Sequence, residues 1–125
     1  MVFVSPQPGV DFLANKVYSE ESGYQRHKPK DLSRVPLTRS YKKVFEYLEK
    51  TETKGNLLDV GCSSGEFLYQ AIKRGFIARG VELNPHTARM AQGNGLNVVI
   101  GTLEGAKFDS ASFDVIFLGD IIEHV

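Results

Sequence analysis

Two carboxylates and a glycine-rich turn are the residues of this sequence best suited to do chemistry. Asp59 lies in an apolar run, Gly61 and Gly65 bracket the turn that follows, and Glu82 ends a second apolar run 21 residues after Gly61. Glycines let the backbone turn sharply and let a ligand lie close against it. A carboxylate after the second strand can accept hydrogen bonds from both hydroxyls of a ribose. The pattern therefore predicts a nucleoside-binding site.

The composition of the turn indicates which kind of nucleoside it would bind. Dinucleotide-binding folds use Gly-x-Gly-x-x-Gly to receive a pyrophosphate. Here Ser63 replaces the middle glycine and the last glycine comes one residue early, while Asp59 and Glu66 make the turn acidic and no basic residue accompanies them. An acidic turn suits a cationic ligand without phosphate, and S-adenosylmethionine carries an ammonium group, a sulfonium and a ribose.

The elements that must position these residues alternate along the chain. The apolar periodicity predicts a parallel sheet with right-handed crossovers, an α/β doubly wound, Rossmann-like domain. A helix is predicted to precede it, capped by Thr38 or Ser40. The predicted strands are 57–60, 77–81, 96–100 and 113–118, the helices are 38–50, 66–74 and 85–92, and a polar loop spans 101–112.

Two regions frame this core. Residues 1–36 are broken by prolines and are predicted to be an irregular N-terminal arm and a candidate substrate lid, with 37–125 as the binding domain. The last strand is almost wholly apolar, as in a central strand. An open edge there would invite aggregation, so we expect further C-terminal strands, or a partner such as a second copy, to cover it.

Charge and composition limit the classes of partner and the cellular compartment that we expect for this protein. The formal net charge is zero, so no global field recruits nucleic acid or membrane. The lone Cys62 cannot form an internal disulfide, and no apolar stretch is long enough to span a bilayer. These features favour a cytoplasmic protein acting on a small molecule.

Several segments resemble one family. Residues 59–65 (Asp-Val-Gly-Cys-Ser-Ser-Gly) look like the first motif of class I S-adenosylmethionine-dependent methyltransferases, and residues 80–85 (Gly-Val-Glu-Leu-Asn-Pro) look like the second. Residues 101–104, 112–116 and 122–125 resemble the later motifs of the type 11/12 branch. The resemblance runs from about Leu57 to Val125. It implies the N-terminal portion of an enzyme that transfers a methyl group in line from S-adenosylmethionine to an O, N or C acceptor.

The resemblance also implies roles for individual residues. Asp59 would hold the cofactor ammonium, the turn would pass along the methionine moiety, Glu82 would accept the ribose hydroxyls and Leu83 would pack on the adenine. The Leu103 backbone would meet the adenine edge. Thr102 stands where the family often has Asp, so Glu104 would take its place at the adenine amine. The complete cofactor-binding set is Asp59, Gly61, Cys62, Ser63, Gly65, Glu82, Leu83, Thr102, Leu103, Glu104, Gly119 and Asp120.

The end of the chain carries the candidates for catalysis. His124 is the best-placed general base, although a structural histidine is the commoner case. Asp120, Glu123 and His124 lie within about one helical turn, a spacing that could hold a divalent ion. No further ligand is visible, so the sequence predicts no metal site.

Other interpretations compete with methyl transfer. Residues 61–65 also match Gly-x-Ser-x-Gly, the hydrolase nucleophile elbow, with Ser63 as nucleophile. Only an arm and one helix precede the turn, however, and Glu82 would have no role there. A non-catalytic S-adenosylmethionine-binding fragment that needs a partner is a further alternative. The basic run between Arg26 and Lys43 could bind RNA, but a solvated face is the commoner case.

Overall fold

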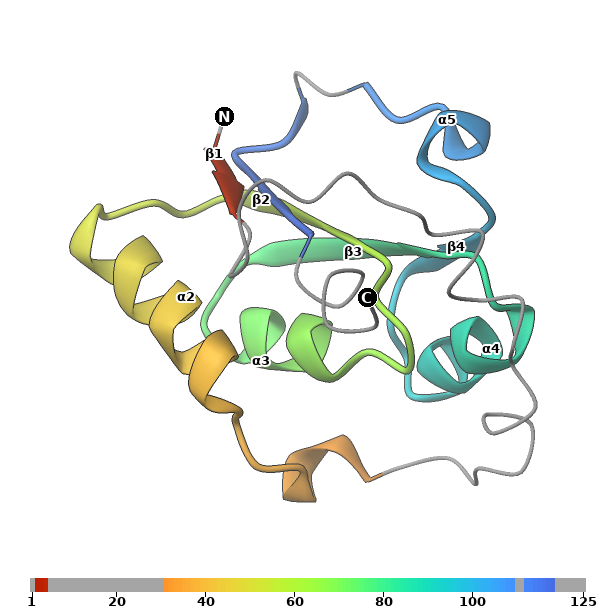
Figure 1. Cartoon of the computed structure of the whole chain (residues 1–125), viewed down its shortest axis with the longest axis horizontal. Coiled ribbons are helices and arrows are strands. Elements are labelled where there is room, and N and C mark those ends of the chain that lie inside the picture. Colours follow the sequence, from red (N-terminus) through yellow and green to blue (C-terminus); the bar gives the residue numbers. More distant parts are fainter. Residues whose placement is uncertain (1, 5–30, 110–111, 119–125) are drawn as a thin grey trace.

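The computed structural model describes residues 2–4, 31–109 and 112–118. Within these ranges the strands form one parallel sheet in the order β1-β5-β2-β3-β4 (Figure 1). The predicted parallel, Rossmann-like α/β architecture is therefore confirmed. The strands are β1 (Val2–Val4), β2 (Asn56–Val60), β3 (Ile77–Glu82), β4 (Val98–Ile100) and β5 (Val115–Phe117), and the helices are η2 (Leu32–Arg34, a 3-10 turn), α2 (Arg39–Lys50), α3 (Glu66–Lys73), α4 (Pro85–Gly93) and α5 (Leu103–Ala106).

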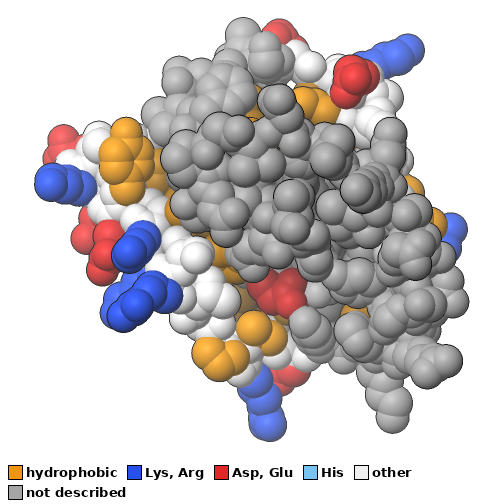
Figure 2. Space-filling model, in the orientation of Figure 1, with side chains coloured by type: hydrophobic (Ala, Val, Ile, Leu, Met, Phe, Trp, Pro, Cys, Tyr) orange, Lys and Arg blue, Asp and Glu red, His pale blue; other side chains and the backbone are white. Residues whose placement is uncertain are grey.

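Helix α2 forms where the apolar spacing predicts it. Thr38 caps the helix, because its side-chain oxygen accepts the Tyr41 N–H at 3.2 Å. Tyr41, Val44, Phe45 and Leu48 repeat at helical spacing, and all four are buried. The opposite side of α2 carries interspersed acidic and basic side chains (Figure 2). In this part of the predicted basic run, the charges form a mixed solvated face.

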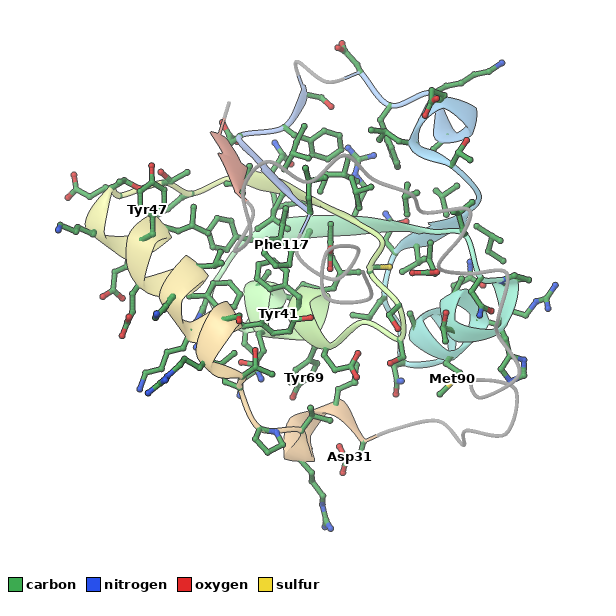
Figure 3. All side chains as sticks on the ribbon, viewed as in Figure 1. Asp31, Tyr41, Tyr47, Tyr69, Met90 and Phe117 are labelled. Carbon is green, nitrogen blue, oxygen red and sulfur yellow. The ribbon has the colours of Figure 1, made fainter. Side chains whose placement is uncertain are left out.

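Helices α2, α3 and α4 cover the same face of the sheet (Figure 1), and their apolar side chains join those of the strands in one core. Phe67 of α3 lies at its centre. Its ring stacks on Phe117 with centroids 3.8 Å apart and on Phe45 at 4.7 Å. Tyr41 meets the edges of this group, between α2 and the sheet (Figure 3). This aromatic cluster fixes α3, and with it the turn that precedes α3.

The other face of the sheet carries a smaller core of Leu58, Val81, Phe113 and Ile116. The predicted polar loop after β4 is wrong in one respect, because residues 103–106 form α5. Thr102 caps this short helix by accepting the Gly105 N–H at 2.9 Å. A helix of four residues is too short to show an apolar period, so the sequence pattern did not indicate it.

Strand β1 lies beside the apolar strand β5. Residues 2–4 were predicted to be part of an irregular arm, but they pair in parallel with residues 115–117. The neighbour of β5 on that side is thus a strand from the start of the same chain. A three-residue strand is too short to show a period of two, which explains why the sequence did not indicate it. The remainder of the predicted arm, residues 5–30, lies outside the described residues.

Candidate functional site

The glycine turn connects β2 to α3 and is held against β3. Gly61, Ser63 and Gly65 all have positive φ, at 78°, 53° and 99°. The N–H groups of Gly61 and Cys62 both donate to the Val81 carbonyl, at 2.8 and 3.1 Å. A side chain at Gly65 would also place its Cβ 2.2 Å from Leu96 Cδ1. The positive φ therefore favours glycine at position 65, and a larger residue there would also require the Leu96 side chain to move.

Glu82 joins this turn to the next one. Its Oε1 accepts the Ser63 N–H at 2.6 Å, and its Oε2 accepts the Asn84 N–H at 2.9 Å. The side chain is fully buried. One carboxylate thus fixes the ends of two adjacent strands. Each carboxylate oxygen can accept more than one hydrogen bond.

Asp59 is the second buried carboxylate of the site. It lies opposite Gly80 in β3 and Phe117 in β5, on the face covered by α3. Gly80 provides no side chain, and Cys62 takes that space, because a Cβ built on Gly80 would lie 2.6 Å from Cys62 Sγ. Asp59 and Glu82 therefore lie near the carboxyl ends of the neighbouring strands β2 and β3.

The pKa of the Cys62 thiol indicates that the turn is electrostatically negative. Burial raises the pKa of its thiol well above the usual value, and the carboxylates of Asp59, Glu82 and Glu66 raise that pKa further. The cause is that a thiolate would add a negative charge to a group of three acids. The same environment favours a ligand that carries positive charge and disfavours one that carries phosphate. Cys62 is itself completely buried and packs inside the turn.

Helix α3 begins without a side-chain cap. In the described part of the chain, α2, α4 and α5 are each capped by the side chain of Thr38, Asn84 or Thr102, whereas Gly65, the residue before α3, makes no such bond. A free helix N-terminus presents N–H donors and a partial positive charge. The turn thus combines backbone donors at α3 with carboxylate acceptors from Asp59 and Glu82, as a ligand with both a carboxylate and an ammonium group requires.

The remaining predicted residues follow β3 and β4 at the same edge. Leu83 is half-buried directly after Glu82, while Leu103 and Glu104 are exposed in α5. The Gly101 N–H donates to the Glu82 carbonyl at 2.9 Å, which connects this segment to the end of β3. The oxygen of Thr102 is used as the α5 cap. Gly119, Asp120, Glu123 and His124 lie outside the described residues, so their predicted roles stay predictions.

Asn84 is the residue that the sequence interpretation missed. Its Oδ1 accepts the N–H groups of His86 and Thr87, at 2.8 and 3.4 Å, and so caps α4. Asn before Pro at a helix start is a recognisable capping signal. The α4 cap is thus Asn84, and Glu82 binds the backbone N–H of that capping residue.

A surface groove of about 470 Å³ lies elsewhere, lined by residues of α2 and of the α3–β3 connection, including Phe45, Leu48, Arg74 and Phe76. These residues lie near the amino ends of β2 and β3, and the acidic turn lies at their carboxyl ends. Ligands of open parallel sheets bind at the carboxyl ends. The groove is therefore separate from the candidate site.

The hydrolase alternative lacks structural support. Among the described residues, the hydroxyl of Ser63 has no imidazole partner, and the Ser63 contact with Glu82 comes from the backbone N–H. A serine nucleophile needs a base within hydrogen-bonding reach.

No helix of the described residues is long and apolar enough to cross a membrane.

Comparison with known proteins agrees with this fold. An uncharacterized protein of Methanocaldococcus jannaschii, MJ1123, is 29% identical over 83 residues, which cover 66% of this chain and 38% of that protein. The structure of WbdD has a TM-score of 0.58 at 16% identity, over 83% of this chain and 28% of WbdD. A hypothetical protein of Thermus thermophilus, TTHA0928, has a TM-score of 0.50 at 28% identity, over 62% of this chain and 50% of its own.

These relatives are longer than the present sequence, which spans less than two-fifths of MJ1123 and of WbdD. A comparison with the sequence patterns of protein families does not depend on the length of these relatives. The pattern of a family described as a methyltransferase domain matches residues 58–125, more than half of the chain, and this match begins in β2 and includes the glycine turn and Glu82. The chain therefore belongs to the methyltransferase domain family.

Proposed function

We propose that this protein binds S-adenosylmethionine at the carboxyl ends of β2, β3 and β4 and transfers its methyl group to a small molecule. One observation carries the proposal. The carboxylates of Asp59, Glu82 and Glu66 all act electrostatically on Cys62 in the turn before α3, and no described side chain caps that helix. This set of donors and acceptors fits an amino-acid tail and a ribose without a phosphate.

Each part of the site has a role in this proposal. Asp59 accepts hydrogen bonds from the ammonium group, and the backbone of residues 61–65 lies along the methionine moiety. Glu82 accepts the ribose hydroxyls while its two backbone contacts hold it in place. Leu83 packs on the adenine, and the Leu103 backbone and Glu104 meet the adenine edge. When bound, the cofactor supplies an activated methyl group, and the protein contributes orientation.

The acceptor side of the reaction is proposed from chemistry alone. An in-line displacement places the acceptor atom opposite the sulfonium leaving group. An acceptor that is a hydroxyl or a protonated amine requires a base, and His124 is our candidate. We propose that the reaction needs no metal ion and no nucleic acid. We also propose that the protein acts in the cytoplasm.

Calorimetry tests the binding step. S-adenosylmethionine and S-adenosylhomocysteine should both bind, while ATP and NAD should not, since their phosphates would face the acidic turn. Binding of ATP or NAD without binding of the other two would refute the proposal. A turnover assay with candidate acceptors then separates an enzyme from a module that only binds the cofactor, because the module would bind without releasing S-adenosylhomocysteine.

A further inference from the structure

Asn84 has a side-chain donor that the described part of the fold does not use. The side chain is only 2% exposed, and its Nδ2 has no hydrogen-bond partner in the described structure. The orientation of the amide is fixed, because the opposite orientation would place Nδ2 against the N–H groups of His86 and Thr87. Buried polar groups are nearly always paired, so an unpaired donor requires an explanation.

Helix capping alone does not explain it. The cap needs only an acceptor, and Thr38 and Thr102 provide one at α2 and α5 with a hydroxyl. Ser, Thr or Asp at position 84 would cap α4 comparably well. The amide nitrogen is therefore an addition to the capping role, placed at a buried position where it costs stability.

The position of Asn84 indicates what the donor is for. The Asn84 N–H donates to Glu82 Oε2 at 2.9 Å, so the residue adjoins the carboxylate proposed to hold the ribose. A sugar hydroxyl both donates and accepts hydrogen bonds. Glu82 can satisfy only the donated hydrogen, and the hydroxyl oxygen still requires a donor. The carboxamide of Asn84, the residue whose backbone N–H binds this carboxylate, can supply the missing donor.

We propose that Asn84 Nδ2 donates a hydrogen bond to a ribose hydroxyl oxygen of the bound nucleoside, and that Asn84 and Glu82 together select a ligand with an intact diol. This inference rests on the proposed function. It makes Asn84 a specificity-determining residue, with the α4 cap as its second role.

The test is a cycle of protein variant and ligand variant. Asn84→Ser keeps a capping oxygen and removes the carboxamide. Calorimetry would measure Kd for S-adenosylhomocysteine and for its 2′-deoxy and 3′-deoxy analogues, with the wild-type protein and the variant. We expect Asn84→Ser to weaken S-adenosylhomocysteine binding about tenfold, the size of one hydrogen bond. Each deoxy analogue is compared with S-adenosylhomocysteine on the same protein. For one of the two analogues, the resulting loss of affinity should be severalfold smaller in the variant than in the wild type.

Thr38→Ser, which changes a cap on α2 far from the site, is the matched control and should leave every Kd unchanged. A uniform loss for all three ligands in Asn84→Ser would overturn the assignment to a hydroxyl. An unchanged Kd, with or without a lower unfolding temperature, would leave capping as the only role and overturn the inference. If the wild type binds none of the ligands, the proposed function fails as well, which distinguishes the two failures.

Discussion

Replacement of Glu82 by glutamine is the most informative single change. The two oxygens of Glu82 accept the Ser63 N–H at 2.6 Å and the Asn84 N–H at 2.9 Å. A glutamine amide has one oxygen and two N–H donors. Glu82→Gln can therefore keep one of the two bonds, while its amino end faces the other backbone N–H, donor against donor.

The size of the effect follows from burial. The Glu82 side chain is fully buried, so water cannot replace the lost acceptor. A buried N–H left without a partner costs about 1–3 kcal/mol, and bonds to a charged group contribute at the upper end of the usual range. We expect Glu82→Gln to lower the free energy of unfolding by about 2–3 kcal/mol. This is a large share of a domain stability of roughly 5–15 kcal/mol.

Thermal and urea unfolding of the ligand-free protein measure this loss. The entropy of unfolding is about 2.1 cal/mol/K per residue, or about 0.26 kcal/mol/K for 125 residues. The expected loss therefore lowers the Tm by roughly 8–11 °C. The wild type and Glu82→Gln should be compared at the same pH and salt concentration, because the substitution also removes one charge.

Glu46→Gln is the matched control, since it makes the same chemical change at an exposed position of α2. Its effect should stay within about 0.5 kcal/mol. If Glu82→Gln were as stable as the wild type or more so, repulsion between Glu82 and the other acids of the turn would outweigh its two hydrogen bonds. That result would refute our interpretation of Glu82 as the residue that fixes both turns.

Three further predictions concern the same region. Phe67→Ala should destabilise the protein by about 3–5 kcal/mol, seen as a lower urea midpoint, because its ring stacks on two others at the centre of the core; a loss below about 1 kcal/mol would contradict this packing. Cys62 should react with a thiol reagent far more slowly in the native than in the unfolded protein at about pH 8, since its raised pKa and its burial both keep it a protected thiol; equal rates would contradict the electrostatics. Asp59→Asn should weaken S-adenosylhomocysteine binding about tenfold in calorimetry, because a charged acceptor of the ammonium becomes neutral; an unchanged Kd would remove Asp59 from the site.

The larger part of the fold could be predicted from the sequence because its elements bury a regular pattern. Helix α2 has four buried residues at helical spacing, and β2 is an apolar run that ends at a glycine. Such patterns record the local geometry directly. Strand β1 and helix α5 could not be found in this way. The first has three residues and depends on pairing with β5, and the second has one turn.

The candidate site divides in the same manner. Asp59, the glycines and Glu82 are detectable because residue type and spacing are enough to suggest them. The bond between Ser63 and Glu82 joins residues 19 positions apart, and it exists only because β2 pairs with β3 in one register. The side-chain donor of Asn84, which is unpaired in the described structure, could not be predicted at all. A capping asparagine is the same in sequence whether or not its Nδ2 makes a hydrogen bond.

The double role of Glu82 limits what its substitution can show about binding. A variant that loosens the turns would lower ligand affinity even if Glu82 never touched the ligand, because the turns themselves form the site. Asn84→Ser avoids this difficulty, since the capping acceptor of α4 is retained and the contacts of Glu82 with the backbone need no change. Comparison of deoxy ligands within one variant removes what is left of the ambiguity, because a loosened turn weakens every ligand alike. The coupling between Asn84 and one hydroxyl therefore tests contact with the sugar more directly than any change to the carboxylate.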